Sequence, residues 1–230
     1  MAALDKRDVV VGILALQGAF AEHQAMLQKL SLKRTITVVL VRTVDDLNLC
    51  DALIIPGGES TTIGVLARVS GLLEPLRQFV RSKPVWGTCA GAILLSETIQ
   101  GSKKGGQDLL GGISIAIARN GWGSQVESFE ADLAVEGLQS PEQSFTGIFI
   151  RAPVVLDLSP SPEDPPIQVI ARLPTNLLPQ SFASLDESDS KTVVALRQGL
   201  HFLTTFHPEL TQDNRFHDYF VRECVLSRET

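Results

Sequence analysis

A cysteine that could act as a nucleophile lies in the segment Gly87-Thr88-Cys89-Ala90-Gly91. The pattern Gly-x-Cys-x-Gly is typical of a nucleophile elbow, a sharp turn from a strand into a helix whose tight backbone requires small neighbours. Residues 92–95 favour a helix, and the dipole at the N-terminus of such a helix favours a thiolate. A buried structural cysteine beside a glycine-rich turn is the alternative.

A histidine and a carboxylate follow much later, in Phe206-His207-Pro208-Glu209. Side chains two positions apart in an extended segment lie on the same side. His207 could therefore exchange a proton with the thiol while Glu209 holds its other ring nitrogen, as in nucleophile–base–orienter triads. An isolated His-Pro-Glu is more often a loop-capping motif, but its pairing with the elbow favours the catalytic interpretation.

A third candidate is the segment Pro56-Gly57-Gly58-Glu59-Ser60-Thr61, which comes directly after a predicted strand. Its two glycines allow the backbone N–H groups to approach a ligand, and a helix that begins near Ser60 or Thr61 adds its dipole. We predict an oxyanion hole whose donors are the N–H groups of Gly58 and Ala90. A phosphate-binding turn is the alternative, but no lysine of Walker type follows.

Composition narrows the class of protein. The chain has 230 residues, of which 44% are hydrophobic, which is enough to bury a sizeable core. The net charge of −6 argues against a protein that binds nucleic acid through phosphates. No apolar run reaches the roughly 18 residues of a membrane helix, and no signal-peptide pattern opens the chain. These features predict a cytoplasmic protein that contacts neither nucleic acid nor membrane.

The cysteine and histidine spacing does not suggest a metal site. Three cysteines, an odd number without a Cys-x-x-Cys pair, argue against a disulfide framework and against zinc. The four histidines form no ligand pair of metal-binding spacing. Cys50 and Cys224 are expected to be inert small hydrophobes. His23 is expected to be packed or partner-facing, and His217 to lie on the exposed side of the last helix.

The elements that would position these residues alternate along the chain. Apolar runs predict strands over 9–16, 36–41, 52–55 and 85–87, with helices after Gly18 and over 72–81, which implies a parallel sheet. Antiparallel additions are expected from further strands over 113–119, 126–133, 147–150 and 167–173. A strand pair over 192–196 and 201–206 should close the chain, before a helix that Asp213 can cap.

One region has an unusual composition. Residues 157–190 contain six of the twelve prolines. We interpret this stretch as a pair of surface loops around the 167–173 strand, more readily a tolerated insertion than a functional lid. Residues 1–230 are then expected to form a single domain.

Taken together and in this order, the three motifs resemble those of class I, triad-type glutamine amidotransferases. Further segments are similar to the family of glutaminase subunits of pyridoxal 5'-phosphate synthases within that class. They are Gly12–Phe20 followed by Glu22-His23, Pro56–Thr62, Gln125–Leu133, Phe149–Pro153 and Thr205–Thr211. The resemblance extends from about Val10 to Val221.

The resemblance implies an α/β fold of flavodoxin-like type, with a mostly parallel central sheet flanked by helices and carrying antiparallel additions. It implies hydrolysis of L-glutamine to glutamate and ammonia, with the ammonia channelled to a synthase subunit in a large hetero-oligomer. The synthase subunit would make pyridoxal 5'-phosphate, which is its product and no cofactor of this chain. No metal or other cofactor is implied.

Carried over residue by residue, the resemblance makes Cys89 the nucleophile, His207 the acid and base, and Glu209 the orienting residue. It assigns glutamine binding to Gly58, Glu59, Ser60, Arg119, Ile150 and Arg151. Two positions depart from the family pattern, Gly121 and Ser124, which affects local rigidity or partner contact. Two alternatives stay open. The chain could be another amidotransferase or cysteine hydrolase on the same scaffold, or a non-catalytic binding subunit that keeps the fold.

Overall fold

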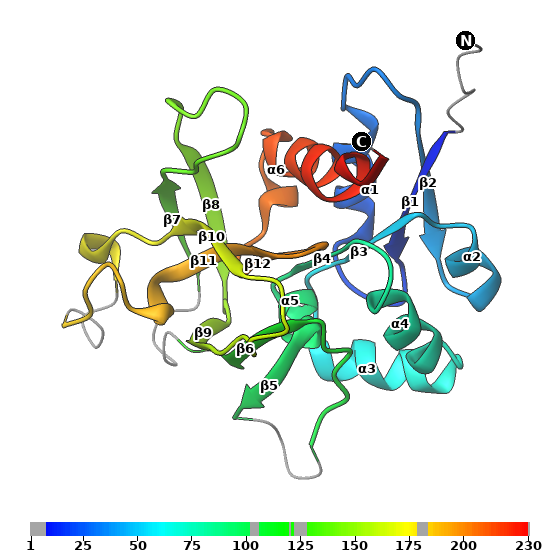
Figure 1. Ribbon diagram of the computed structural model, residues 1–230, viewed down its shortest axis with the longest axis horizontal. Coiled ribbons are helices and arrows are strands. Elements are labelled where there is room, and N and C mark those ends of the chain that lie inside the picture. The colour runs from blue at the N-terminus through cyan, green and yellow to red at the C-terminus, as the bar shows by residue number, and fades with distance from the viewer. Residues whose placement is uncertain (1–7, 102–105, 120, 122–127, 179–183, 230) are drawn as a thin grey trace.

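A seven-stranded sheet forms the centre of the computed structural model, which describes residues 8–101, 106–119, 121, 128–178 and 184–229. The strand order is β10-β11-β12-β4-β3-β1-β2 (Figure 1). The strands are β1 Val9–Leu14, β2 Ile36–Val41, β3 Ala52–Ile55, β4 Val85–Thr88, β10 Ile167–Arg172, β11 Val193–Gln198 and β12 His201–Thr204. Neighbours pair in parallel from β2 to β12, whereas β11 is antiparallel to β10 and β12.

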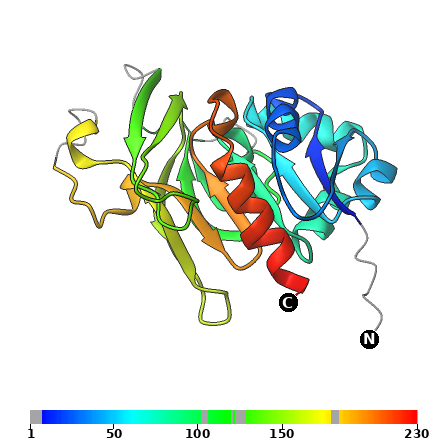
Figure 2. The ribbon, with the colours of Figure 1, turned by 90° about the horizontal axis from the view of Figure 1, so that it is seen from above.

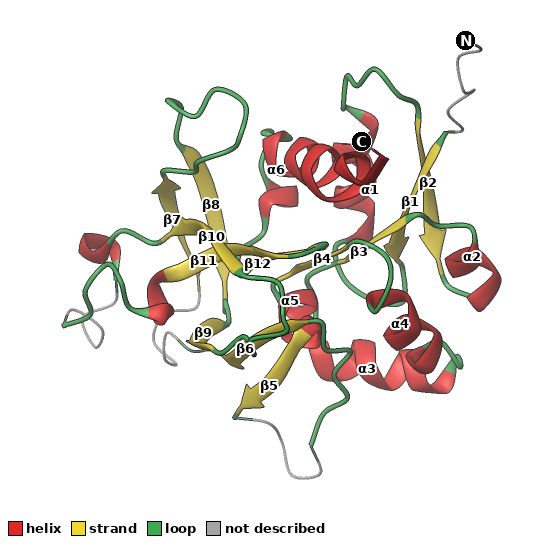
Figure 3. Cartoon of the chain, in the orientation of Figure 1, coloured by secondary structure: helices red, strands yellow, loops and turns green. Residues whose placement is uncertain are grey.

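Helices cover both faces of this sheet. On one face lie α1 (Phe20–Gln28) and α6 (Arg215–Tyr219), and on the other lie α3 (Ser60–Val69), α4 (Leu73–Val80) and α5 (Ala90–Leu95) (Figures 1 and 3). Each face has its own cluster of buried apolar side chains. Strands β3, β4 and β12 are buried throughout, as expected for parallel strands covered on both faces.

The C-terminal segment continues α6 along the sheet. A π-helical turn over Phe220–Val225 and a 3-10 turn over Leu226–Glu229 complete it. Figure 2 shows this segment lying across the sheet, on the face that also carries α1. Asp213 accepts a hydrogen bond from the Arg215 N–H (3.0 Å), although the N-cap position itself is Asn214.

Two smaller sheets supply the antiparallel additions. One has the order β5-β6-β9, from Ser96–Gln100, Ile113–Ala118 and Val154–Leu158, with β5 parallel and β9 antiparallel to β6. The other pairs β7 (Ser128–Leu133) with β8 (Phe145–Ile150) in antiparallel orientation. Together with the parallel centre, they confirm the predicted α/β class with antiparallel additions. The first two residues of the predicted strand 126–133 lie outside the described residues.

Several predicted elements differ in extent or were absent from the prediction. The first strand ends at Leu14 and not at residue 16, and the strand predicted over 192–196 continues to Gln198. The short helix α2 (Val44–Asn48), β5 and β9 were not predicted. A capping box starts α2, because Thr43 accepts the Asp46 N–H while the Asp46 carboxylate accepts the Thr43 N–H.

The proline-rich region 157–190 contains β10 and a 3-10 turn over Thr175–Leu177, and a second 3-10 turn, over Ser190–Thr192, begins at its last residue. The loop before β10 is hydrogen-bonded to residues of β6 and β11. The Asp164 carboxylate accepts a hydrogen bond from Ser114 Oγ (3.0 Å), and the Pro165 carbonyl accepts one from the buried Gln198 Nε2 (3.0 Å). This loop therefore has more contacts than a simple surface insertion requires.

The prediction for His217 is wrong. Its side chain is wholly buried, because α6 presses it against the core, with its ring 4.8 Å from the Trp86 ring. Cys50 and Cys224 are buried and unpaired, and burial raises their pKa values to about 11 and about 12, which suits inert thiols. Within the described ranges, no helix has the length and apolar character needed to cross a membrane.

Candidate active site

Cys89 occupies the sharp turn between β4 and α5. Its backbone lies at φ 47° and ψ −101°, a region that costs about 1–3 kcal/mol for a residue with a side chain. The neighbouring glycines are needed for contact of backbone with backbone. A Cβ on Gly91 would lie 2.0 Å from the Ile55 carbonyl oxygen, and one on Gly87 would lie 2.5 Å from Gly91. The predicted elbow is thus present in the structure.

His207 reaches Cys89 because β12 is the parallel neighbour of β4. Thr204, at the end of β12, is in register with Thr88, and the Thr204 carbonyl accepts the Cys89 N–H (2.9 Å). The His207 N–H is bound by the carbonyl of Ile148 in β8 (2.8 Å). A 3-10 turn over Pro208–Leu210 then brings the Glu209 carboxylate to 2.7 Å from His207 Nδ1.

The electrostatics favour an ionised site. Burial alone would lower the pKa of His207, but hydrogen bonds and charge attraction from Cys89 and Glu209 outweigh it and raise that pKa well above the usual value. Burial would likewise raise the pKa of Glu209, but the adjacent His23 and His207 hold it below its usual range. The arrangement can therefore supply an imidazolium beside the cysteine sulfur, held by a buried carboxylate.

A cavity of about 330 Å³ opens onto Cys89 and His207. Its volume falls within the range of small-molecule sites. Its wall contains all six predicted glutamine-binding residues and both predicted oxyanion donors: Gly58, Glu59, Ser60, Ala90, Arg119, Ile150 and Arg151. Glu209 does not line the cavity, because it lies behind His207. Gln17 and Ile93 complete the wall, and neither was singled out from the sequence.

Opposite charges face each other in this cavity wall. Glu59 caps α3 by accepting the N–H groups of Thr61 and Thr62, and it pairs with the guanidinium of Arg119. Burial opposes ionisation of Glu59, but these hydrogen bonds lower its pKa to about 2. A permanent carboxylate and a guanidinium in one wall can bind the α-amine and the α-carboxylate of an amino acid.

The predicted oxyanion loop is held by the connection between β1 and α1. The Gly57 carbonyl accepts the Ala19 N–H (3.0 Å), and Gln17 Oε1 accepts the Glu59 N–H (2.9 Å). Gly18 adopts φ 104°, and a Cβ there would lie 1.9 Å from the Gly57 oxygen. The start of α1 and the loop at 57–59 therefore cannot move independently of each other.

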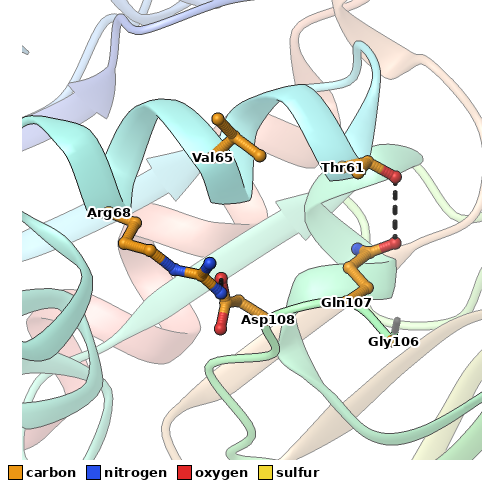
Figure 4. A pocket seen from close by; sticks show the side chains of 6 residues that line it. All are labelled: Thr61, Val65, Arg68, Gly106, Gln107 and Asp108. Atoms are coloured by element: carbon orange, nitrogen blue, oxygen red, sulfur yellow. Dashed lines mark hydrogen bonds and ion pairs between the residues drawn. The ribbon is translucent and has the colours of Figure 1, made fainter. Parts of the chain in front are cut away.

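A second pocket, of about 280 Å³, lies beside the site between α3 and residues 106–108. In Figure 4, Thr61 and Gln107 point toward one another across it, and Arg68 points toward Asp108, with which it forms an ion pair. Gln107 Oε1 also accepts hydrogen bonds from Ser60 Oγ (3.2 Å) and Arg119 Nη1 (3.0 Å). Gln107 therefore links Ser60 and Arg119 of the active-site cavity with Thr61 of the second pocket, a role that no pattern in the sequence indicated.

The two departures from the family pattern have different outcomes. Gly121 packs closely on β9, since a Cβ there would lie 2.5 Å from Val154 Cβ, so a glycine suits this position. Ser124 lies outside the described residues. Among the residues that the structure describes, no cluster of three or more His, Cys, Asp or Glu side chains is placed to hold a metal ion.

Comparison with known proteins agrees with this geometry. The model of the SNO glutamine amidotransferase family matches residues 13–226. A probable pyridoxal 5'-phosphate synthase subunit PDX2 from Arabidopsis thaliana is 45% identical over 226 residues, which cover 93% of this chain and 85% of that protein. The pyridoxal 5'-phosphate synthase subunit PdxT of Roseiflexus sp. (strain RS-1) is 43% identical over 93% of this chain and 99% of its own length.

Solved structures support the same grouping. A crystal structure of a glutamine amidotransferase matches with a TM-score of 0.72 and 42% identity, covering 92% of this chain and 97% of the other. A putative GMP synthase subunit from Thermoplasma acidophilum matches with a TM-score of 0.55 at 16% identity over 97% of each chain, which indicates the fold alone. The fold and family resemblance inferred from the sequence is thereby confirmed.

Proposed function

The chain belongs to the SNO glutamine amidotransferase family, and we propose that it hydrolyses L-glutamine as the glutaminase subunit of a pyridoxal 5'-phosphate synthase. One observation carries the chemistry: Cys89 and His207, the latter bonded to Glu209 behind it, line a cavity whose wall holds the Glu59–Arg119 ion pair. The cavity thus combines a nucleophile with charges suited to a free amino acid. The whole chain would act as one amidotransferase domain.

The reaction we propose is acyl transfer through a thioester. The Cys89 thiolate attacks the side-chain amide carbon of glutamine, and the N–H groups of Gly58 and Ala90 stabilise the oxyanion. Protonated His207 donates its proton to the leaving nitrogen, which departs as ammonia. His207 then activates a water molecule that releases glutamate, while Glu209 keeps the imidazole oriented. None of these steps requires a metal or an organic cofactor.

Substrate binding follows from the cavity wall. Glu59 binds the α-amine of glutamine and Arg119 its α-carboxylate, so the substrate exchanges its own charges for the existing ion pair. Ser60, Ile150 and Arg151 complete the contacts, with Ile150 and Arg151 at the end of β8 beside Cys89. A peptide or a neutral amide lacks these paired charges and should react poorly.

The synthase partner would receive the ammonia within a large hetero-oligomer. We propose that it contacts α1, because the Gly57 carbonyl is bonded to the Ala19 N–H at the start of that helix. Ordering of this connection would fix the N–H of Gly58 toward the substrate. Three cysteines that are all unpaired suit a reducing compartment, and we place the protein in the cytoplasm.

The test is steady-state hydrolysis of glutamine by the chain alone and with saturating synthase subunit. Loss of one oxyanion donor typically costs about 10²- to 10³-fold in rate, so the isolated chain should be a poor glutaminase that the partner activates. Equal rates would exclude activation through the oxyanion loop and leave the acyl transfer intact. A panel of amides and peptides separates a glutaminase from a general cysteine hydrolase. No turnover of glutamine in the complex would refute the proposed function.

A further inference from the structure

The orienting carboxylate has one oxygen that the triad does not use. Glu209 Oε1 is bonded to His207 Nδ1, whereas Oε2 is buried and forms no hydrogen bond with any described residue. It lies 3.5 Å from His23 Nε2 in α1. A buried carboxylate oxygen left without a donor costs free energy. The geometry around His23 decides whether a donor is present.

His23 belongs to a buried chain of polar groups. Its Nδ1 lies 2.9 Å from His217 Nε2, and its Nε2 lies 3.2 Å from Thr88 Oγ1, the residue before the nucleophile. Both histidine side chains are fully buried, and both rings pack edge-on against Trp86. Residues from α1, β4, α6 and the Pro208–Leu210 turn thus meet behind the triad.

Both histidines are neutral at neutral pH. Burial lowers the pKa of His217 to about 3, and burial together with His217 and His207 lowers that of His23 to about 3 despite the attraction of Glu209. Each ring therefore carries a single proton on one of its two nitrogens. The hydrogen bond between the rings requires that one ring donates and the other accepts.

If His23 donates from Nδ1, the lone pair on its Nε2 can accept from the Thr88 hydroxyl but also faces the Glu209 carboxylate, and the Nδ1–H of His217 is buried without an acceptor among the described residues. If His217 donates from Nε2, the proton of His23 sits on Nε2 and points toward Glu209 Oε2 and Thr88. The second arrangement replaces a repulsion by an attraction, and it leaves only one lone pair, on His217 Nδ1, unpartnered.

We propose that His23 is a positioning residue for Glu209, donating from Nε2, and that His217 fixes this tautomer. The inference rests on the proposed function for its catalytic consequence, but the tautomer itself does not. Through Glu209, His23 keeps the carboxylate aligned with His207 while the thiolate is formed and protonated. Behind the triad, the neutral imidazoles of His23 and His217 thus orient Glu209 without adding a charge of their own.

Activity of the synthase complex tests the role of the donor. His23→Gln keeps an N–H donor near the Nε2 position, whereas His23→Leu removes it. We expect His23→Leu to lower kcat about 10- to 100-fold with little change in KM, and His23→Gln to retain most of the activity. His201→Leu is the matched control, since His201 is also a buried histidine but lines a different pocket, whose wall contains no triad residue; its kcat should stay at the wild-type value.

A pH profile separates positioning from a merely structural role. Two titratable groups, His207 and His23, face Glu209. His23 itself is faced by Glu209, His217 and His207. Cys89 faces His207. A misaligned Glu209 stabilises the His207 imidazolium less, so the alkaline limb of kcat/KM should move to lower pH in His23→Leu and return in His23→Gln. An unmoved limb, or equal losses in both variants, would contradict the proposal.

The tautomer can be measured without any substrate. Nitrogen-15 spectra of histidine-labelled wild-type protein should show His23 and His217 both protonated on Nε2 and bare on Nδ1. Protonation of His23 on Nδ1 would overturn the proposal, whatever the variants do. This measurement also distinguishes the two failures, because a chain that does not hydrolyse glutamine would still report the tautomer.

Discussion

A single methyl group added at Gly57 should lower the rate of catalysis while the protein stays folded. A Cβ on Gly57 would lie 2.3 Å from His207 Cε1 and 2.8 Å from its Nδ1. Ordinary contacts begin at 3.4 Å, so the imidazole would have to move by 3.4 − 2.3, or about 1 Å. A misplacement of about 1 Å in a catalytic group can cost about 10²-fold in rate. We therefore predict that Gly57→Ala lowers kcat about 100-fold.

The same substitution should leave the protein folded. Overpacking of a buried site typically costs about 1–3 kcal/mol, less than the total stability of most domains. Gly64→Ala in α3 is the control, because a Cβ there would lie 3.6 Å from its nearest neighbour, Asp108 Cβ. Replacing a glycine inside a helix by alanine should stabilise it by about 0.5–1 kcal/mol. The assay is glutamate release by the complex, with urea unfolding of both variants. Wild-type kcat in Gly57→Ala would refute the reasoning.

Three further predictions concern single side chains. Cys89→Ala should abolish glutamine turnover but not product formation from supplied ammonia by the synthase complex; substantial glutamate release would disprove the nucleophile. Glu209→Gln should lower kcat with little change in KM, whereas normal kcat with a raised KM would make Glu209 a substrate ligand. For His201, burial outweighs a hydrogen bond with Val80 and lowers the pKa to about 4. Since the unfolded state then binds more protons between about pH 6.5 and 4, the free energy of unfolding should fall by about 2 kcal/mol from pH 7 to 5. Urea unfolding should show this loss reduced in His201→Gln, and an equal loss in both proteins would contradict it.

The sequence was most informative where a residue pattern coincides with a strand end. The alternation of apolar runs and helical periodicity predicted the parallel centre, since each buried strand there is short and mostly apolar. It missed α2, whose five residues are too few to show a period, and β5, which follows α5 without an intervening loop. It also placed His217 on the surface, because the pattern of the last helix does not reveal that α6 is covered by α1.

The cavity residues were predictable to a similar extent. Cys89, His207 and the loop at 57–60 each lie in a compact motif, and the family resemblance added Arg119 and Arg151, which the residues alone did not indicate. Gln107 could not be predicted, since its link to Ser60 joins positions 47 apart through a loop without a motif. The same holds for the contact between His23 and Glu209, which depends on how α1 packs on the turn after β12.

The elbow shows how a strained nucleophile can be held without side chains. Cys89 adopts a positive φ, and its sulfur contacts the His207 imidazole and, at 4.0 Å, the Ile150 carbonyl, neither of which holds the backbone of the turn. Its position is instead fixed by close backbone packing of Gly91 on Ile55 and of Gly87 on Gly91, and by the bond of its N–H to Thr204. Because backbone atoms cannot change rotamer, such a support leaves the sulfur accessible to substrate while it prevents relaxation of the turn. If the proposed function holds, we expect control by a partner to act on the glycine loop at 57–58 and exchange of substrate to act on the Glu59–Arg119 pair, because neither is fixed by such close backbone packing with the elbow.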